Sequence, residues 1–376
     1  GITVKVKANQ PVETSQKLTT GDDGFQRLSI TLSNNGTESV AIESIVVQVP
    51  LSDTLSEKMK VAYGGSAMGT PVLVHKVGEQ QKESLSFMYA MVQMKPDNYL
   101  FAGSLSWRIF LPEFKLEDNA FVIQTNGEGK VLKPGESINY EQIVLSRSKS
   151  WQNLLDTYGS AIAKENGVNQ LKDVEYRGWA TWDYYGGNFS DEDIYENIKQ
   201  IKEIAPLSNL IQIDAGWYSQ MGDFSTPRPD LPGGIKAIAD SINAAGMTPG
   251  VWIDGFRANT DSEIFKNHPE YFLHDEEGNV IFHDRTSVKT VFFDYSHPGT
   301  SRYMAECIRV LKEEKGFPYF KVDFIGYGLN RNILKGTKTF KGIKPYDPSI
   351  TDVERVRIGL KAIRKAIGPE NYFLGL

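Results

Sequence analysis

The stretch Tyr319-Phe320-Lys321-Val322-Asp323-Phe324 decides how the rest of this chain is interpreted. It follows Phe317-Pro318 and precedes Gly326-Tyr327-Gly328, which predicts a short strand that runs into a loop. Because strand side chains alternate between faces, Lys321 and Asp323 point to the same side. At the end of a buried parallel strand two such charges face either a polar pocket or each other, so a structural ion pair stays open as an alternative.

The amino-acid composition is that of a globular protein and limits the partners that the protein could bind. The chain has 376 residues, of which 40% are hydrophobic and 23% charged, enough for two globular domains. The net charge is −6 and the basic residues are scattered, which argues against a nucleic-acid partner or an anionic membrane surface. We find no apolar run of membrane-spanning length and no signal peptide at Gly1, so we expect a processed or engineered start.

The single cysteine says little about where the protein resides. Cys307 lies at helical spacing from Met304, Ile308 and Leu311, which predicts a buried core thiol and not a nucleophile. One cysteine suits a cytoplasmic protein and a bacterial periplasmic or secreted one equally, so the localisation stays unknown. The oligomeric state is also open.

Residues 1–148 have the pattern of a β-sandwich domain, with short alternating strands separated by turns. Leu28, Ile30 and Leu32 alternate with polar residues, and the turn signal at 34–36 leads to a second apolar stretch at 42–49. This spacing predicts a hairpin. Residues 149–175 are predicted to form a linking helix and connection, since Trp151, Leu154, Leu155, Tyr158 and Ile162 share one helical face.

From Tyr176 to the C-terminus, short apolar strands alternate with amphipathic helices, which predicts a parallel sheet. Capping boxes mark two of the helices, at Ser190 with Asp193 and at Thr351 with Glu354. Neither a GxGxxG turn nor a GxxxxGK(S/T) loop is present, so we prefer a (β/α)8 TIM-type barrel over an open nucleotide-binding sheet. A whole barrel needs about 250 residues and only about 200 follow Tyr176, so we expect residues 176–376 to hold an incomplete barrel that stops after about five strands.

Carboxylates and aromatic residues recur where the predicted strands end. The four ends read Trp182-Asp183-Tyr184-Tyr185, Asp214-Ala215-Gly216-Trp217, Trp252-Ile253-Asp254-Gly255 and Lys321-Val322-Asp323. One such Asp would more often cap a helix, but four ends together favour a site, because barrel enzymes build their active sites there. Aromatic faces beside carboxylates suit a sugar.

A metal site is not indicated by the histidine pattern. The five histidines, His75, His268, His274, His283 and His297, lack paired ligand spacing. We place His283-Asp284 in a surface loop. A metal is therefore a weak alternative.

The order of these motifs resembles glycoside hydrolase family 36, a family of α-galactosidases and related α-N-acetylgalactosaminidases and raffinose synthases. The resemblance covers about Asn119 to the C-terminus. It rests on Gly178-Trp179-Ala180-Thr181-Trp182, Ile213-Asp214-Ala215-Gly216-Trp217, Pro249-Gly250-Val251-Trp252-Ile253, His268-Pro269-Glu270 and Tyr319-Phe320-Lys321-Val322-Asp323-Phe324.

This resemblance implies a β-sandwich, a (β/α)8 barrel and a C-terminal β-domain. It further implies that Asp323 is the nucleophile, that Lys321 contacts substrate, and that Asp214, Trp182 and Trp252 line the sugar subsite. The family's acid/base Asp follows the sixth strand, so by resemblance we expect it beyond Leu376, and we expect the 376-residue chain alone to be inactive.

Two positions depart from the family pattern. The usual Asp-Asp pair at the second strand end is Asp214-Ala215 here, which removes one hydroxyl-binding carboxylate. The third strand end reads Asp254-Gly255-Phe256 where Ala-Pro-Phe or Glu-Pro-Glu is usual, so we expect Asp254 to supply a replacement carboxylate to the substrate.

The function expected from this resemblance is a retaining α-galactosidase-like glycosidase that hydrolyses α-galactosyl linkages in oligo- or polysaccharides. Such an enzyme uses two carboxyl groups about 5–5.5 Å apart, one as nucleophile and one as proton shuttle, and requires no metal or organic cofactor. Two alternatives stay open. One is a non-hydrolytic carbohydrate-binding protein on a degenerate barrel, in which Asp323 and Lys321 only pair with each other. The other is an α-galactosyl transglycosidase.

Overall fold

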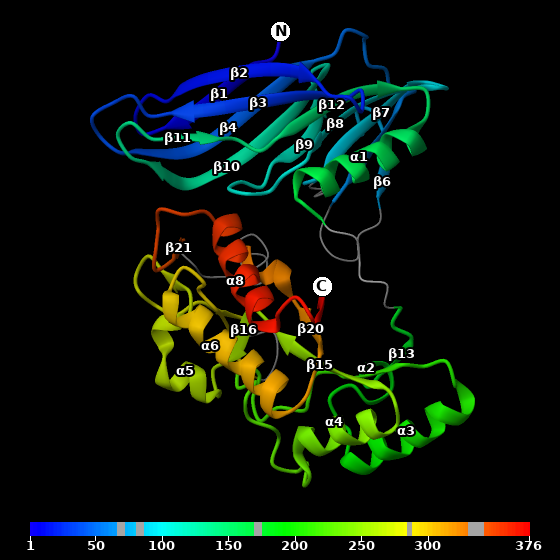
Figure 1. The fold of residues 1–376 in the computed structure, drawn as a ribbon. Coiled ribbons are helices and arrows are strands. Elements are labelled where there is room, and N and C mark those ends of the chain that lie inside the picture. Colours follow the sequence, from blue (N-terminus) through cyan, green and yellow to red (C-terminus); the bar gives the residue numbers. More distant parts are fainter. Residues whose placement is uncertain (66–71, 80–85, 169–174, 284–287, 330–341) are drawn as a thin grey trace. The chain divides into compact units, whose positions relative to one another are not determined.

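The structure is a computed structural model that describes residues 1–65, 72–79, 86–168, 175–283, 288–329 and 342–376. The chain divides into two compact units. The first comprises Gly1–Leu171 together with Pro348–Glu354, and the second comprises Lys172–Asp347 together with Arg355–Leu376 (Figure 1). The first unit therefore takes a short segment from late in the chain, which the sequence pattern does not reveal.

The first unit is built from two antiparallel sheets. One has the order β1-β4-β10-β9, and the other the order β11-β3-β12-β8-β7-β5-β6, with β2 paired to β3. Their inward side chains alternate with outward ones and share one apolar core, as a sandwich requires. The strands are β1 Thr3–Ala8, β2 Glu13–Thr20, β3 Gln26–Ser33, β4 Val40–Pro50, β5 Lys60–Gly64, β6 Leu73–Lys76, β7 Tyr89–Lys95, β8 Asn98–Ser104, β9 Glu113–Glu117, β10 Ala120–Leu132, β11 Ser137–Asn139 and β12 Ile143–Ser148.

The predicted hairpin between residues 28–32 and 42–49 is wrong. Strand β3 pairs with β2, β11 and β12, whereas β4 pairs with β1 and β10, so the connection crosses from one sheet to the other. Asn34 explains why the chain does not turn back. Its side chain is fully buried and donates hydrogen bonds to Glu38 O (2.8 Å) and Leu132 O (2.9 Å). The amide thus fixes a crossing point between the sheets.

Helix α1 (Trp151–Glu165) packs on the second sheet through most of its predicted apolar face, but Trp151 is 43% exposed and lies outside the contact. Ser150 caps its N-terminus by accepting from Asn153 N, and Leu154, Tyr158 and Ala161 are buried. The Tyr158 hydroxyl donates to Ser104 O (2.6 Å) and lies 2.9 Å from Met88 O. The polar tip of this buried ring is therefore satisfied.

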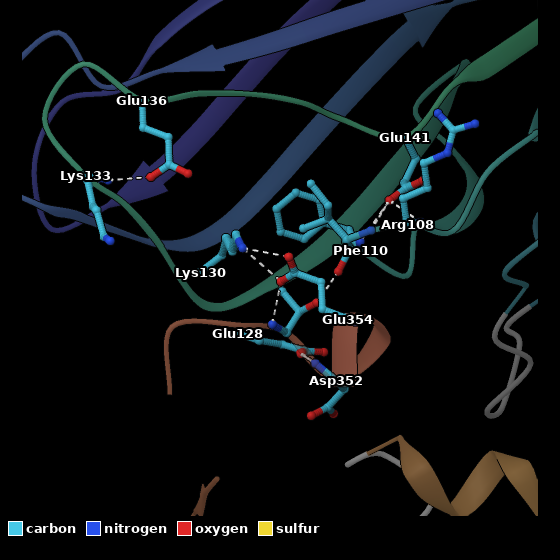
Figure 2. A network of polar contacts seen from close by, with 11 residues as sticks. Arg108, Phe110, Glu128, Lys130, Lys133, Glu136, Glu141, Asp352 and Glu354 are labelled. Atoms are coloured by element: carbon cyan, nitrogen blue, oxygen red, sulfur yellow. Dashed lines mark hydrogen bonds and ion pairs between the residues drawn. The ribbon is translucent and has the colours of Figure 1, made fainter. Parts of the chain in front are cut away.

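The late segment Pro348–Glu354 is joined to the sandwich by a network of polar contacts (Figure 2). Both carboxylate oxygens of Glu354 accept from Lys130 Nζ, at 2.8 and 2.9 Å. The Asp352 N–H donates to Glu128 Oε2 at 2.7 Å. Glu354 also accepts from Thr351 N (2.9 Å), which confirms the predicted capping box at the start of α8 (Asp352–Ile367).

The same network includes a buried carboxylate that organises a loop of the sandwich (Figure 2). Glu141 is 1% exposed and accepts the backbone N–H groups of Arg108 (2.8 Å), Ile109 (2.7 Å) and Phe110 (2.9 Å). Three aligned donors stabilise the charge where water cannot reach it. The Thr351 hydroxyl donates to the Ile109 carbonyl, so the late segment is also hydrogen-bonded to the loop that Glu141 holds.

The second unit contains a parallel sheet of five described strands in sequential order: β13, β14, β15, β20 and β22. Sequential parallel strands with intervening helices are the arrangement of a barrel wall. The strands are β13 Gly178–Ala180, β14 Leu210–Ile213, β15 Thr248–Asp254, β20 Tyr319–Asp323 and β22 Tyr372–Gly375. The helices are α2 Trp182–Tyr185, α3 Asp191–Ile204, α4 Gly234–Ala244, α5 Glu263–Asn267, α6 Pro298–Arg309 and α8, with a π-helical turn η2 at Val310–Glu314.

A long excursion separates β15 from α6. It contains β16 (Arg257–Asn259), β18 (Phe282–His283) and β19 (Thr290–Phe292), which form one small antiparallel sheet. It also holds the 3-10 turn η1 (Pro269–Tyr271) and β17 (His274–Asp275), which pairs with β21 (Ile343–Lys344). His283 is 6% exposed and meets Phe292 and Tyr327 edge-on, so its predicted place in a surface loop is wrong; Asp284 lies outside the described residues.

The helices of this unit follow the apolar stripes predicted for them. Helix α3 has the predicted capping box at Ser190 and Asp193. Helix α6 starts at Pro298, where the His297 side chain caps the helix by accepting from Gly299 N. Cys307 is buried as predicted, and burial raises the pKa of its thiol to about 12. Within the described residues, no helix is both long and apolar enough to cross a membrane.

Residues that are paired in register on neighbouring strands place their side chains at the same height along the parallel sheet. Tyr319 and Tyr372 are paired in register and their rings stack, with centroids 4.9 Å apart. Tyr176 meets both rings edge-on. Gly250 lies beside this cluster, where a Cβ atom would come within 2.9 Å of the Tyr319 ring. The next levels towards the strand ends hold Lys321 with Trp252 and then Asp323 with Asp254.

Candidate active site at the strand ends

Two strand-end residues predicted for the site are joined by an ion pair. Asp214 follows β14, is 2% exposed, and accepts from Lys321 Nζ at 2.8 Å. Gln212 donates to the same oxygen at 2.6 Å, and the Ala215 N–H donates to the other at 2.8 Å. Within the described residues, Lys321 pairs with Asp214 and not with Asp323. The alternative in which Lys321 and Asp323 form a structural ion pair is therefore wrong: Lys321, on β20, pairs with Asp214, at the end of β14.

A second pair of predicted residues meets at the end of β20. Trp252 Nε1 donates to Asp323 Oδ2 at 3.0 Å, and the Phe324 N–H donates to Asp323 Oδ1 at 2.7 Å. Each carboxylate oxygen thus has one donor, which fixes the plane of the group. Trp252 is itself 3% exposed, and its carbonyl accepts from Trp217 Nε1 at 2.9 Å. Tyr218 stacks on Trp252, and burial raises the pKa of the Tyr218 hydroxyl.

The backbone turns sharply directly after Asp323. Phe324 has φ 57° and ψ 30°, the left-handed conformation that non-glycine residues adopt at a cost. The 3-10 turn η3 (Ile325–Gly328) follows, and the Arg355 side chain donates to Gly328 O at 2.9 Å. A residue in this conformation persists only where the surrounding contacts hold it.

Asp254 does not fit the role of replacement carboxylate. It is fully buried, its Oδ2 accepts from Arg257 Nε at 2.7 Å, and its Oδ1 accepts the N–H groups of Phe256 and Arg257. Burial raises the pKa of this carboxyl, while Arg257 and the backbone donors act in the opposite direction. A sugar hydroxyl would have to compete with an ion-paired arginine to reach it, so these contacts favour a structural role for Asp254.

Trp182 lies on the rim of the site. It is the first residue of α2 and is 51% exposed. The preceding Thr181 is buried, donates its N–H to Gln212 O (3.2 Å), and accepts the Asp214 N–H at its hydroxyl (3.0 Å). Trp182 is therefore held next to Asp214 through the backbone, with a face open to solvent.

Sequence reasoning missed the residues that hold these loops together. Arg228 donates to the carbonyls of Gly187 (3.0 Å) and Gly216 (2.9 Å), which joins the loops after β13 and β14. Arg257 was missed although it stands three residues after Asp254, close enough in sequence for a local ion pair. Among the described residues, no group of three His, Cys, Asp or Glu side chains could hold a metal ion.

Comparison with known proteins agrees with this architecture. A solved structure of the GH36 α-galactosidase AgaA from Geobacillus stearothermophilus, a variant bound to 1-deoxygalactonojirimycin, superposes with a TM-score of 0.67 at 16% identity. The superposition covers 100% of this chain and 59% of the AgaA chain. The α-galactosidase TtGalA from Thermus thermophilus gives a TM-score of 0.65 at 14% identity, covering 96% and 70%. The fold is thus that of α-galactosidases with a β-sandwich and a TIM barrel.

Sequence comparison gives the family. The sequence model of the Melibiase family matches residues 148–343, and the chain belongs to this family of GH36-like α-galactosidases. AgaA is 22% identical over 239 residues, which are 60% of this chain and 31% of that protein. An A type blood α-D-galactosamine galactosaminidase from Flavonifractor plautii is 22% identical over 264 residues, 68% of this chain and 21% of that protein. These sequence alignments cover less than a third of the length of either relative.

Proposed function

We propose that the protein is a retaining α-galactosidase-like glycosidase that hydrolyses α-galactosyl linkages in oligo- or polysaccharides, with Asp323 as nucleophile. The observation that carries this proposal is the Asp323 carboxylate at the end of β20. It is held by Trp252 Nε1 and the Phe324 N–H, one donor to each oxygen. A carboxylate fixed in this way is ready to attack the anomeric carbon and form a glycosyl-enzyme ester.

The neighbouring ion pair supports a sugar as the ligand. Asp214 can accept one further hydrogen bond, because a carboxylate offers about four acceptor positions and three are filled. Lys321 Nζ has donors beyond the one given to Asp214. Together they present an acceptor and donors to the hydroxyl groups of a sugar, while Trp182, which is 51% exposed, offers a ring face to its C–H bonds. Trp252 is buried and stacked on Tyr218, so it acts on the site through its hydrogen bond to Asp323.

The choice of α-galactosides rests on family membership and on the relatives. TtGalA has been solved with stachyose, and an AgaA variant with raffinose. Both ligands are oligosaccharides, so we propose substrates of that class for this protein. The same covalent intermediate serves transglycosylation, and analysis of the products separates the two outcomes.

The test is to replace Asp323 by Asn and by Gly in the full-length protein and to measure turnover of an aryl α-galactoside together with a melting curve. We expect both variants to lose turnover and to keep the fold, since the covalent step loses its nucleophile. Asp240→Asn is a matched control, because Asp240 is an exposed carboxylate on α4 that pairs with Lys236. Near-wild-type turnover in Asp323→Asn would remove the basis for this proposal.

The Asp323→Gly variant also tests whether Asp323 forms the covalent bond to the sugar. If Asp323 is the nucleophile, azide added to Asp323→Gly should restore turnover of an activated aryl substrate and give a galactosyl azide. A purely structural role for the carboxylate predicts no such product.

A further inference from the structure

The turn after Asp323 is held by side chains from another strand. Phe324 adopts its left-handed conformation without the freedom of a glycine, so neighbouring residues must maintain it. Its N–H is one of the two donors to Asp323, at 2.7 Å. Whatever fixes Phe324 therefore also fixes the Asp323 carboxylate.

Arg257 packs on both ends of this turn. Its Cζ lies 3.7 Å above the centroid of the Phe324 ring and 4.5 Å from the centroid of the Tyr327 ring. The Tyr327 N–H donates to the Phe324 carbonyl at 3.0 Å, which closes the turn between the two rings. A planar guanidinium in contact with two aromatic faces is a stacking interaction that a lysine does not reproduce.

Asp254 orients Arg257. The Arg257 Nε–Asp254 Oδ2 distance is 2.7 Å, and the carboxylate is buried with two backbone donors on its other oxygen. In the strand register Asp254 is the partner of Asp323 on the neighbouring strand. The guanidinium therefore reaches from the start of β16 to the turn after β20, and only 15% of the Arg257 side chain is exposed.

We propose that Arg257, held by Asp254, is a positioning residue that keeps the Phe324 N–H aimed at Asp323. This inference rests on the proposed function, in which Asp323 is the nucleophile. It also accounts for the third strand end, where Asp254-Gly255-Phe256 departs from the pattern of the resembled family. Here Asp254 acts through Arg257 and not on the substrate.

The main variant is Arg257→Met, which keeps an unbranched side chain out to about the position of Nε and removes the guanidinium. The first readout needs no turnover: the amide resonance of Phe324 in protein labelled with 15N-phenylalanine, assigned by its loss in Phe324→Leu. We expect this resonance to move upfield and its hydrogen exchange to speed up at least tenfold in Arg257→Met. Asp254→Asn should shift it in the same direction by less, and Arg257→Lys should not restore it.

The second readout is kinetic. In the full-length protein we expect Arg257→Met to lower kcat for an aryl α-galactoside at least tenfold, with KM within about twofold of wild type. Arg309→Met is the matched control, since Arg309 is an exposed arginine on α6 that pairs with Glu306. It should change neither the resonance nor kcat.

The outcomes separate the two proposals. An unchanged Phe324 resonance in Arg257→Met, or a loss that appears only in KM, overturns the positioning role even if Asp323→Asn is inactive. A fully active Asp323→Asn overturns the nucleophile assignment and the positioning role with it. A shifted resonance together with a reduced kcat supports both.

Discussion

Replacing Asp214 by Ala is expected to weaken catalysis by an amount that follows from its contacts. The carboxylate already accepts from Lys321, Gln212 and the Ala215 N–H, which leaves one acceptor position for a sugar hydroxyl. A hydrogen bond to a charged group contributes about 1.5–3 kcal/mol. Since each 1.4 kcal/mol is tenfold, kcat/KM should fall by roughly tenfold to a little over a hundredfold.

The same replacement also has a cost in stability. Lys321 has only 17% of its side chain exposed, and in Asp214→Ala its ammonium group loses its ion-pair partner. Removing one partner of a buried pair costs about 3–5 kcal/mol, and the residual exposure of Lys321 places the expected loss at the lower end of that range. Unfolding by urea should detect it.

The double variant Asp214→Ala with Lys321→Met separates the two effects. Removing the unpaired charge should recover most of the lost stability, whereas kcat/KM should stay low because the sugar still lacks its acceptor. The assays are urea unfolding and initial rates on an aryl α-galactoside. The reasoning is refuted if Asp214→Ala keeps more than half of wild-type kcat/KM, or if the double variant regains activity along with stability.

Two further predictions concern specificity and the network of the first unit. Ala215→Asp should restore a carboxylate pair at the second strand end and sharpen discrimination in kcat/KM between an aryl α-galactoside and its 6-deoxy and 4-epimeric analogues; an unchanged ratio would show that another residue fills that role. Glu354→Ala should lower the free energy of unfolding by about 2–3 kcal/mol, because it removes a capping contact and leaves Lys130 without its partner. Glu354→Gln, which keeps the capping contact, should cost less in the same urea titration, and equal losses would contradict the role of the cap.

Local patterns predicted local structure well. The Ser190 and Thr351 capping boxes and the apolar stripe at Cys307 each depend on residues within one or two turns, and each is present. The strand ends that hold Asp214, Trp252 and Asp323 were also located, because the alternation of short strands and amphipathic helices fixes where each strand stops.

Contacts between distant residues were not predictable in this way. Alternating apolar residues look the same in a hairpin and in two strands of different sheets. The structure is needed to show that β3 and β4 belong to different sheets and that Asn34, which lies between them in sequence, is buried. The partner of Lys321 depends on the register between strands, which places Asp214 within reach. The left-handed conformation of Phe324 has no sequence signal, and the residue whose guanidinium lies on its ring, Arg257, is 67 positions away in the sequence.

The late segment that joins the sandwich sets an order for biosynthesis. Lys130 leaves the ribosome long before its partner Glu354, which is 224 residues further along. At elongation rates of about 5–20 residues per second, that gap lasts roughly 11–45 s. During this interval the nascent sandwich carries an unneutralised lysine and an open site for residues 348–354, a surface that a chaperone could cover until the segment arrives.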